Sequence, residues 1–214
     1  IREKALRPEH PDVAMSLNNL GFLYIHQGRF AEAEAILQRS VKIYKITYGP
    51  EHPNVAISLG NLGVVYNNQS RFAEAGLLYK KSLKINEKVF GREHPKVALS
   101  LNNLANHYIF KANYAEAEPL LQRSLKIYEI AYGPEHPDIA PVLNNFAIVY
   151  DNKGDYTKAE QYLKRALTLQ EKGLGREHSS ITANLNTLGL LYSKQGRYAE
   201  AEDFYKKSLA IKEI

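Results

Sequence analysis

Adjacent asparagines recur in the middle of segments whose apolar residues have α-helical spacing. The first pair, Asn18 and Asn19, lies in the stretch SLNNLGFLYIHQGRF, and counterparts follow at intervals of 42 residues. Asparagine is a mediocre helix former, because its side chain competes for backbone hydrogen bonds. An amide group carries both hydrogen-bond donors and an acceptor. A repeated row of amides could therefore hold the N–H and C=O groups of an extended peptide backbone.

The histidines and serines give no comparable indication of chemistry. Histidines occupy positions 10, 52, 94, 136 and 178. Equivalent loops of packed repeats lie about 10 Å apart, whereas zinc–nitrogen bonds are about 2 Å long. We therefore expect these histidines to cap and pack loops, and we expect no metal ion and no cofactor. The sequence contains no HExxH, GxSxG, Walker-type or GxGxxG motif, so we predict that the protein is not an enzyme.

The interval of 42 residues belongs to the whole chain. The marker EHP occurs at 9–11, 51–53, 93–95 and 135–137, and residues 10–51 and 94–135 are identical at 27 of 42 positions. Such self-similarity indicates a repeat architecture. We predict one elongated domain over residues 1–214. It would begin with the tail of a preceding repeat at 1–9 and continue with repeats at approximately 10–51, 52–93, 94–135, 136–177 and 178–214.

Each repeat is predicted to contain two helices. The first begins at the proline after histidine, such as Pro11, and ends near Gly28, because glycine adopts the left-handed conformation of a helix C-terminus cheaply. Ser70 and Ala112 replace that glycine, so repeats two and three should have weaker corners. The second helix is expected from about residue 30 to residue 48. No stretch alternates with period two, so the fold class is predicted to be all-α.

The junction between the two helices resembles a known family. The residues that carry the resemblance are Leu20, Gly21, Tyr24, Gly28, Phe30 and Ala33. Their types and spacing resemble the tetratricopeptide signature. The repeat length, the phrase FAEAE and the closing YGPEHP resemble the kinesin light chain type of tetratricopeptide repeat. The resemblance implies a right-handed α-solenoid of five helix-turn-helix repeats that binds a protein or peptide partner, with the first helices lining the concave groove.

The candidate site follows from a helical wheel. Leu17, Leu20 and Tyr24 should face the second helix, while Asn19, Phe22 and His26 lie on the opposite side. The resemblance implies that this side lines the groove and that its asparagines contact a peptide. The candidate peptide-binding residues are Asn18, Asn19, Phe22, His26, Asn61, Val64, Asn68, Asn102, Asn103, Asn106, Phe110, Asn144, Asn145, Asn152, Asn186 and Lys194.

Two questions about this row of asparagines stay open at the level of sequence. The amides could contact a peptide, or they could bridge adjacent first helices and stiffen the solenoid, and the two roles can coexist. The ligand class also needs a choice. Kinesin-type grooves that take acidic peptides need basic residues, and this groove has few charges, so a peptide with apolar anchors is expected.

A row of basic residues on the second helices suggests a different partner. Its members are Arg39, Lys81, Arg123, Arg165 and Lys207, with Lys42, Lys84 and Lys126 nearby. Glu32, Glu74, Glu116 and Glu200 are expected to neutralise part of this row. We expect a solvated surface there, with nucleic acid as an unlikely partner. A structural spacer or a self-associating scaffold is the other alternative function.

Composition sets the remaining expectations. The net charge of +5 on 214 residues is mild and predicts no dedicated polyanion partner. Cysteine is absent, and no apolar run has the length of a membrane span, so we expect a cytoplasmic protein without membrane contact. Residues 1–6 align with 43–48, and Ile214 aligns with Ile46. We therefore expect flanking repeats in a longer chain and end-to-end self-association of this one.

Overall fold

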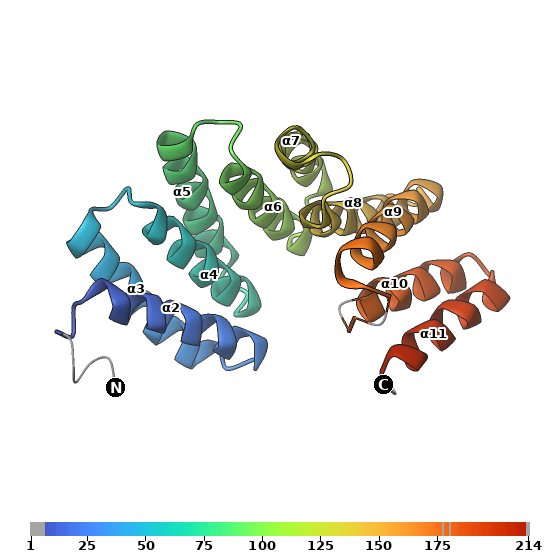
Figure 1. Ribbon diagram of the computed structural model, residues 1–214, viewed down its shortest axis with the longest axis horizontal. Coiled ribbons are helices and arrows are strands. Elements are labelled where there is room, and N and C mark those ends of the chain that lie inside the picture. Colours follow the sequence, from blue (N-terminus) through green and yellow to red (C-terminus); the bar gives the residue numbers. More distant parts are fainter. Residues whose placement is uncertain (1–6, 177, 180, 213–214) are drawn as a thin grey trace. The chain divides into compact units, whose positions relative to one another are not determined.

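The computed structural model describes residues 7–176, 178–179 and 181–212. This part of the chain forms ten α-helices and one 3-10 helix, η1, and it contains no strand (Figure 1). In chain order the elements are α2 (Pro11–His26), α3 (Phe30–Tyr48), α4 (Pro53–Asn68), α5 (Phe72–Phe90), α6 (Pro95–Phe110), α7 (Tyr114–Tyr132), η1 (Pro137–Ile139), α8 (Ala140–Asn152), α9 (Tyr156–Leu174), α10 (Ile181–Lys194) and α11 (Tyr198–Lys212).

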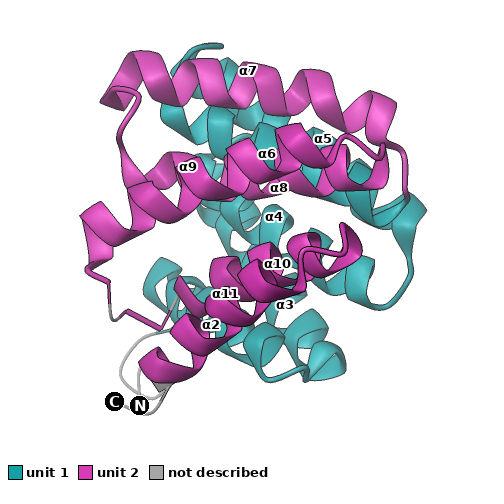
Figure 2. Cartoon of the chain, turned by 90° about the vertical axis from the view of Figure 1, so that its right-hand side faces the viewer, with its two compact units in different colours: residues 1–111 teal, residues 112–214 magenta. Residues whose placement is uncertain are grey.

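The chain divides into two compact units, Ile1–Lys111 and Ala112–Ile214 (Figure 2). Unit 1 contains α2 to α6, and unit 2 contains α7 to α11. Within unit 1, α2, α4 and α6 are neighbours, and α3 and α5 pack against them. Within unit 2, α8 packs against α7 and α9, and α10 packs against α9 and α11. The continuous single domain predicted from the repeats remains a prediction.

Histidine side chains cap the first helices, as the sequence predicted. Nδ1 of His52 accepts a hydrogen bond of 3.2 Å from the N–H of Asn54, and its ring stacks on Tyr48. Nδ1 of His94 accepts one of 3.1 Å from Lys96, and its ring stacks on Phe90 in the same way. The proline that follows each histidine has no N–H to satisfy at the first helical position. The repeated His-Pro pair is therefore a helix start.

The fourth repeat begins differently from the others. Its first turn is the 3-10 helix η1, and the α-helix α8 starts only at Ala140. The N–H of Ala140 bonds to the carbonyl of Pro137, three residues back. Pro141 follows directly and has no N–H with which to make the α-helical bond to that carbonyl. The second proline thus explains why this turn is tighter than the equivalent turns of α2, α4 and α6.

The corners between helices differ in strain. Gly28 has a φ of 72°, and the non-glycine residues Ser70 and Ala112 at the equivalent corners have φ of 61° and 53°. A side chain in this left-handed region costs roughly 1–2 kcal/mol. The weaker corners predicted for repeats two and three are therefore present.

Glycine at these corners should strengthen the fold. We expect Ser70→Gly and Ala112→Gly each to raise the free energy of unfolding by about 0.5–1 kcal/mol, because relief of strain exceeds the extra entropy of glycine in the unfolded chain. Denaturant titration measures the change. Gly28→Ala is the matched reverse substitution and should lower stability. Equal stability of all three variants and the wild type would contradict the assignment of strain.

A cluster that we call the inter-repeat clamp joins a second helix to the following repeat. In unit 1 Arg71 donates to Glu34 at 2.8 Å and lies over the ring of Tyr66. In unit 2 the Tyr192 hydroxyl donates to Glu160 at 2.7 Å, and Arg197 donates to it at 2.9 Å. Burial raises the pKa of Glu160, but hydrogen bonds from Tyr192, Arg197 and a neighbouring lysine outweigh burial and lower it to about 2.

Two further junctions show how the clamp varies. Between α7 and α8, Glu118 accepts from the hydroxyl of Tyr150 at 2.6 Å and pairs with a lysine. Between α5 and α6 the glutamate is replaced by Gly76, and the ring of His107 fills the space. A Cβ at residue 76 would lie 2.9 Å from Nε2 of His107, whose Nδ1 is 2.7 Å from Oδ1 of Asn67. A neutral, buried pair thus replaces the charged clamp there.

Candidate peptide-binding face

The exposed side of α2, α4 and α6 that points away from α3 and α5 is here called the first-helix face. Five large apolar side chains on these helices are each about half-exposed: Met15 and Phe22 on α2, Ile57 on α4, and Leu99 and Phe110 on α6. Exposed apolar side chains grouped on neighbouring elements are typical of interaction surfaces. Ile57 and Leu99 were missed as site residues, although each lies one repeat after the residue before it in the series Met15, Ile57, Leu99.

The amides on this face do form a bridge between first helices, but at one position of unit 1. Nδ2 of Asn61 donates to Oδ1 of Asn18 at 3.1 Å. The equivalent pair one repeat later would be residue 60 with Asn103, and residue 60 is glycine. A Cβ added at Gly60 would lie 4.0 Å from Nδ2 of Asn103, which is ordinary contact distance. The missing bridge is therefore a matter of sequence rather than of space.

Unit 2 shows the same interruption. The equivalent pair there is Asn144 with residue 187, which is threonine instead of asparagine. Thr187 donates its hydroxyl to the carbonyl of Ala183 in its own helix. Oδ1 of Asn144 is buried and has no hydrogen-bond partner among the described residues. Gly60 and Thr187, the two departures from the asparagine pair, thus fall at positions where a bridge would form.

Restoring the second amide should stabilise unit 2. We expect Thr187→Asn to raise the free energy of unfolding by about 1 kcal/mol, because its Nδ2 can donate to Oδ1 of Asn144 as Asn61 donates to Asn18. Denaturant titration measures the change. Thr187→Val is the matched control, because it removes the hydroxyl without supplying an amide. A Thr187→Asn variant no more stable than Thr187→Val would argue against the bridge.

The remaining candidates differ in exposure. The exposed members are Asn19, Phe22, His26, Asn68, Asn106, Phe110, Asn152 and Lys194; the half-buried ones are Asn18, Asn61, Val64, Asn103, Asn144 and Asn186; Asn102 and Asn145 are buried. The Phe22 and His26 rings meet edge to face at 4.4 Å. Asn68 and Asn152 each donate to the carbonyl four residues back in the same helix. Their second amide hydrogens and carbonyl oxygens stay available for other partners.

Charges on the first helices of unit 2 neutralise one another. Nζ of Lys194 on α10 is 2.6 Å from Oδ2 of Asp151 on α8. Exposed Ile148 and Leu190 belong to the same two helices. The side of α8 and α10 that carries these residues is therefore apolar and amide-rich, with one internally balanced ion pair.

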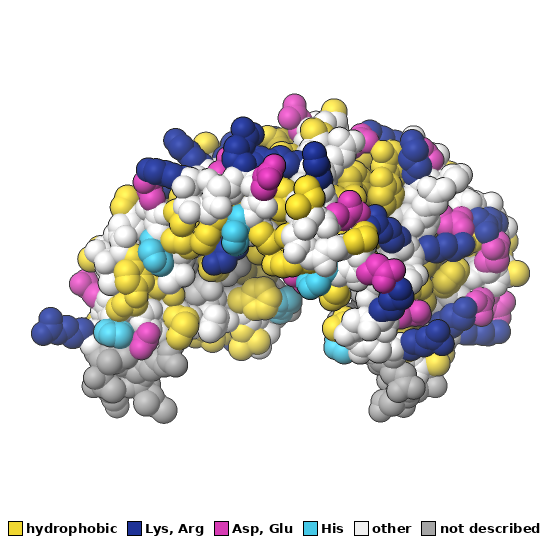
Figure 3. Space-filling model, turned by 45° about the horizontal axis from the view of Figure 1, so that its top comes forward, with side chains coloured by type: hydrophobic (Ala, Val, Ile, Leu, Met, Phe, Trp, Pro, Cys, Tyr) yellow, Lys and Arg dark blue, Asp and Glu magenta, His cyan; other side chains and the backbone are white. Residues whose placement is uncertain are grey.

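The acidic residues of the second helices do not pair as expected. Glu32, Glu74 and Glu200 were expected to neutralise the basic row, and this was wrong for these three. Each pairs instead with the arginine three residues before it, as Arg71 does with Glu74 at 2.7 Å. A side chain three residues away on the same helix turn is nearer than one two turns along. In Figure 3 lysine and arginine side chains lie among aspartates and glutamates.

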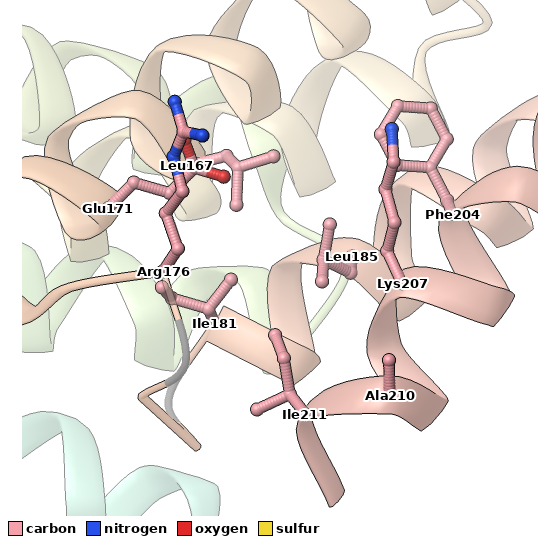
Figure 4. A pocket seen from close by; sticks show the side chains of 9 residues that line it. All are labelled: Leu167, Glu171, Arg176, Ile181, Leu185, Phe204, Lys207, Ala210 and Ile211. Atoms are coloured by element: carbon pink, nitrogen blue, oxygen red, sulfur yellow. The ribbon is translucent and has the colours of Figure 1, made fainter.

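A hollow of about 440 Å³ lies in unit 2 among α9, α10 and α11, apart from the candidate residues. Its lining is mainly apolar, with Leu185, Phe204 and Ile211 among the side chains, and it also includes Glu171 and Arg176 (Figure 4). Within the described ranges no group of histidines and carboxylates is arranged to hold a metal ion. No helix in this part of the chain is long and apolar enough to cross a membrane.

Comparison with known proteins identifies the family. The tetratricopeptide repeat model matches residues 1–45, 12–88, 61–130, 96–172 and 138–214, which together span the chain. The chain belongs to the tetratricopeptide repeat family. Its fold class is the all-α, right-handed solenoid of helix-turn-helix repeats, as predicted. Proteins of this family are generally protein–protein interaction modules and typically non-enzymatic scaffolds. No curated protein sequence matches the chain.

Solved structures agree with this family and with the kinesin light chain type of repeat. The chain is 28% identical to a set of nearly identical TPR-like repeats assigned to a kinesin light chain of Podosopora anserina, with a TM-score of 0.70 over 95% of this chain and 96% of that one. BtubC (BKLC) from P. vanneervenii is 22% identical, with a TM-score of 0.75 over 94% and 80% of the two chains. A Rap protein complexed with Competence and Sporulation Factor shares the fold at 18% identity, with a TM-score of 0.78 over 91% of this chain and 52% of that one.

Proposed function

We propose that this tetratricopeptide repeat chain is a non-catalytic module that binds an extended peptide segment of a partner protein along its first helices. The single observation that carries the proposal is the first-helix face of unit 1, where half-exposed apolar side chains flank a row of amides. The apolar side chains supply the burial that drives association, and the amides supply hydrogen bonds that do not depend on the peptide's side chains.

The contact residues follow from exposure. Phe22 and Leu99 are proposed as apolar contacts, and Asn19 and Asn103 as amide contacts with the peptide backbone. Asn61 and Asn18 bond to each other and keep neighbouring first helices in register, so the two roles considered for the asparagines coexist. Asn102 and Asn145, which are buried, are left out of the proposed contact set.

The chemistry of the partner follows from the charges. The one ion pair on the first helices of unit 2 is internal, between Lys194 and Asp151. A surface without an excess of either charge has no means to select an acidic or a basic segment. We therefore propose a peptide with two or more apolar anchor residues and little net charge. The cytoplasm remains the compartment predicted from sequence, and nucleic acid remains an unlikely partner.

Selection from a peptide library displayed on phage tests the proposal for a partner of any sequence. The purified 214-residue chain should enrich a motif of spaced apolar residues with few charges. Enrichment should be lost when a free peptide of the selected sequence competes. Failure to enrich any sequence would favour a structural spacer, and enrichment of an acidic motif would contradict the proposed partner chemistry.

A further inference from the structure

The inter-repeat clamp has two halves that come from different repeats. The acceptor half is a glutamate on a second helix, such as Glu160. The donor half is a tyrosine and an arginine from the following repeat, such as Tyr192 and Arg197. Each half is arranged within its own repeat. Lys164 holds Glu160 from four residues along the helix at 2.6 Å, and the Arg197 guanidinium lies 4.0 Å from the centre of the Tyr192 ring.

A donor half without an acceptor lies beside α2. The Arg29 guanidinium is 3.9 Å from the centre of the Tyr24 ring, and Arg29 also bonds to Gln27 and Glu32. This arrangement matches Arg71, which lies over Tyr66 and bonds to its own neighbouring glutamine and glutamate. Among the described residues no carboxylate takes the place beside Arg29 that Glu34 takes beside Arg71.

An acceptor half without a donor lies on α11. Glu202 is the repeat equivalent of Glu160, and Lys206 holds it at 2.7 Å as Lys164 holds Glu160. Within the described part of unit 2, no tyrosine or arginine bonds to Glu202. The chain therefore carries both halves of one clamp on separate surfaces.

Apolar residues surround the donor half. Leu20 and Leu23 on α2 are 37% and 49% exposed. Their equivalents on α4, Leu62 and Val65, are 5% and 0% exposed, because the preceding second helix α3 packs on α4. We call the surface formed by Leu20, Leu23, Tyr24 and Arg29 the leading face. It has the residue types that α4 uses to receive a second helix.

Apolar residues also surround the acceptor half. Tyr205 and Leu209 on α11 are 40% and 56% exposed. The equivalent of Tyr205 in unit 1, Tyr79, is only 3% exposed, and the equivalent of Leu209 on α3, Val41, is 7% exposed. We call the surface formed by Glu202, Tyr205 and Leu209 the trailing face. It has the residue types that a second helix uses to receive the next repeat.

We propose that the trailing face of one copy of this chain binds the leading face of a second copy. Leu209 packs against Leu20 and Leu23 of the second copy, and Glu202 accepts hydrogen bonds from Tyr24 and Arg29 of that copy. Charge complementarity and the three clamps within the chain support this occupant over an unrelated partner. The contact is heterologous, so each copy keeps one free face, and assembly continues head to tail with rising concentration.

Sedimentation equilibrium over a range of concentrations tests the apolar part of the contact. The wild-type chain should increase in average mass with concentration, and Leu209→Lys should remain a monomer. Leu77→Lys is the matched control, because Leu77 is 69% exposed on α5 and belongs to neither face. A wild type that stays monomeric, or an equal loss of association in both variants, would overturn the proposal.

A charge exchange tests the clamp itself. Glu202→Arg and Arg29→Glu should each weaken association about tenfold or more, because each places like charges in the contact. An equimolar mixture of the two variants restores one opposite-charge contact, and so does the double variant, so both should recover association. Single variants that associate like the wild type, or a double variant that associates no better than either single variant, would refute the pairing. Circular dichroism confirms that each variant is folded, and the first-helix face is unchanged in all of them.

Discussion

Gly63→Ala is expected to lower the free energy of unfolding by about 1–3 kcal/mol, although alanine is the better helix former. A Cβ at this position of α4 would lie 2.8–3.0 Å from three ring carbons of Tyr79 on α5. Tyr79 is 3% exposed, so its ring has little room to move. Overpacking should therefore exceed the gain in helix propensity. Denaturant titration of the purified variant measures the loss.

A second glycine of the same helix is the control. Gly60 is also helical, but a Cβ there meets no atom closer than 4.0 Å. Gly60→Ala should therefore raise the free energy of unfolding by about 0.5–1 kcal/mol, the usual gain when glycine is replaced inside a helix. The two substitutions are chemically identical and should have opposite signs. The same sign for both would mean that the approach of Tyr79 does not decide the residue at position 63.

The fourth repeat suggests how the loss at Gly63 can be rescued. Ala147 and Leu163 occupy the positions of Gly63 and Tyr79 there and are both buried in the same core cluster. The double variant Gly63→Ala with Tyr79→Leu copies that pair. Its stability should exceed the sum of the single effects by about 1 kcal/mol or more, since neighbouring core residues couple. Additive effects would count against the contact as the cause.

Leu99→Glu is expected to weaken binding of a selected peptide about 100-fold, which corresponds to roughly 2.7 kcal/mol. Leu99 is half-exposed on α6, and the proposed peptide would cover it, so a carboxylate there loses water without gaining a partner. The fold should tolerate the substitution, because the free chain leaves the side chain in contact with water. Isothermal titration gives the affinity and a thermal melt gives the stability.

Leu77→Glu is the matched control for this binding experiment. Leu77 is more exposed than Leu99 and lies on α5, a second helix outside the first-helix face. Its substitution should leave affinity unchanged. Equal loss of affinity in both variants would indicate a general effect of negative charge, and no loss in Leu99→Glu would move the peptide away from this face.

The periodic sequence predicted the elements well because each boundary depends on local residues. The first helix was expected from Pro11 to just before Gly28, and α2 spans Pro11–His26. The second was expected from about residue 30 to residue 48, and α3 spans Phe30–Tyr48. Capping by histidine, a fixed φ at proline and a positive φ at glycine all act within a few residues. Pro141 changed one turn for an equally local reason, which the sequence also contains.

Contacts between repeats were harder to anticipate. The asparagine pairs were recognised, but only the structure showed that residue 18 bonds to residue 61 and that Gly60 and Thr187 interrupt the series. The partners of Glu34 and Glu160 were not foreseen, because tyrosine and arginine reach them from 32 to 37 residues away in sequence. Such pairings depend on the rotation between repeats, which no local pattern specifies. Peptide contact by the candidate residues remains a proposal.

Methyl NMR tests the central claim, peptide binding to the first-helix face, most directly. The chain has a single methionine, Met15, which is 43% exposed on that face, so a methionine-labelled sample gives one reporter signal there. Isoleucine labelling adds Ile57 on the same face and Ile130 on α7, a second helix, as the internal control. On titration with a selected peptide, the Met15 and Ile57 signals should shift and saturate at the concentration given by the calorimetric affinity, while Ile130 stays in place. Saturable binding that leaves Met15 and Ile57 unshifted would contradict the account.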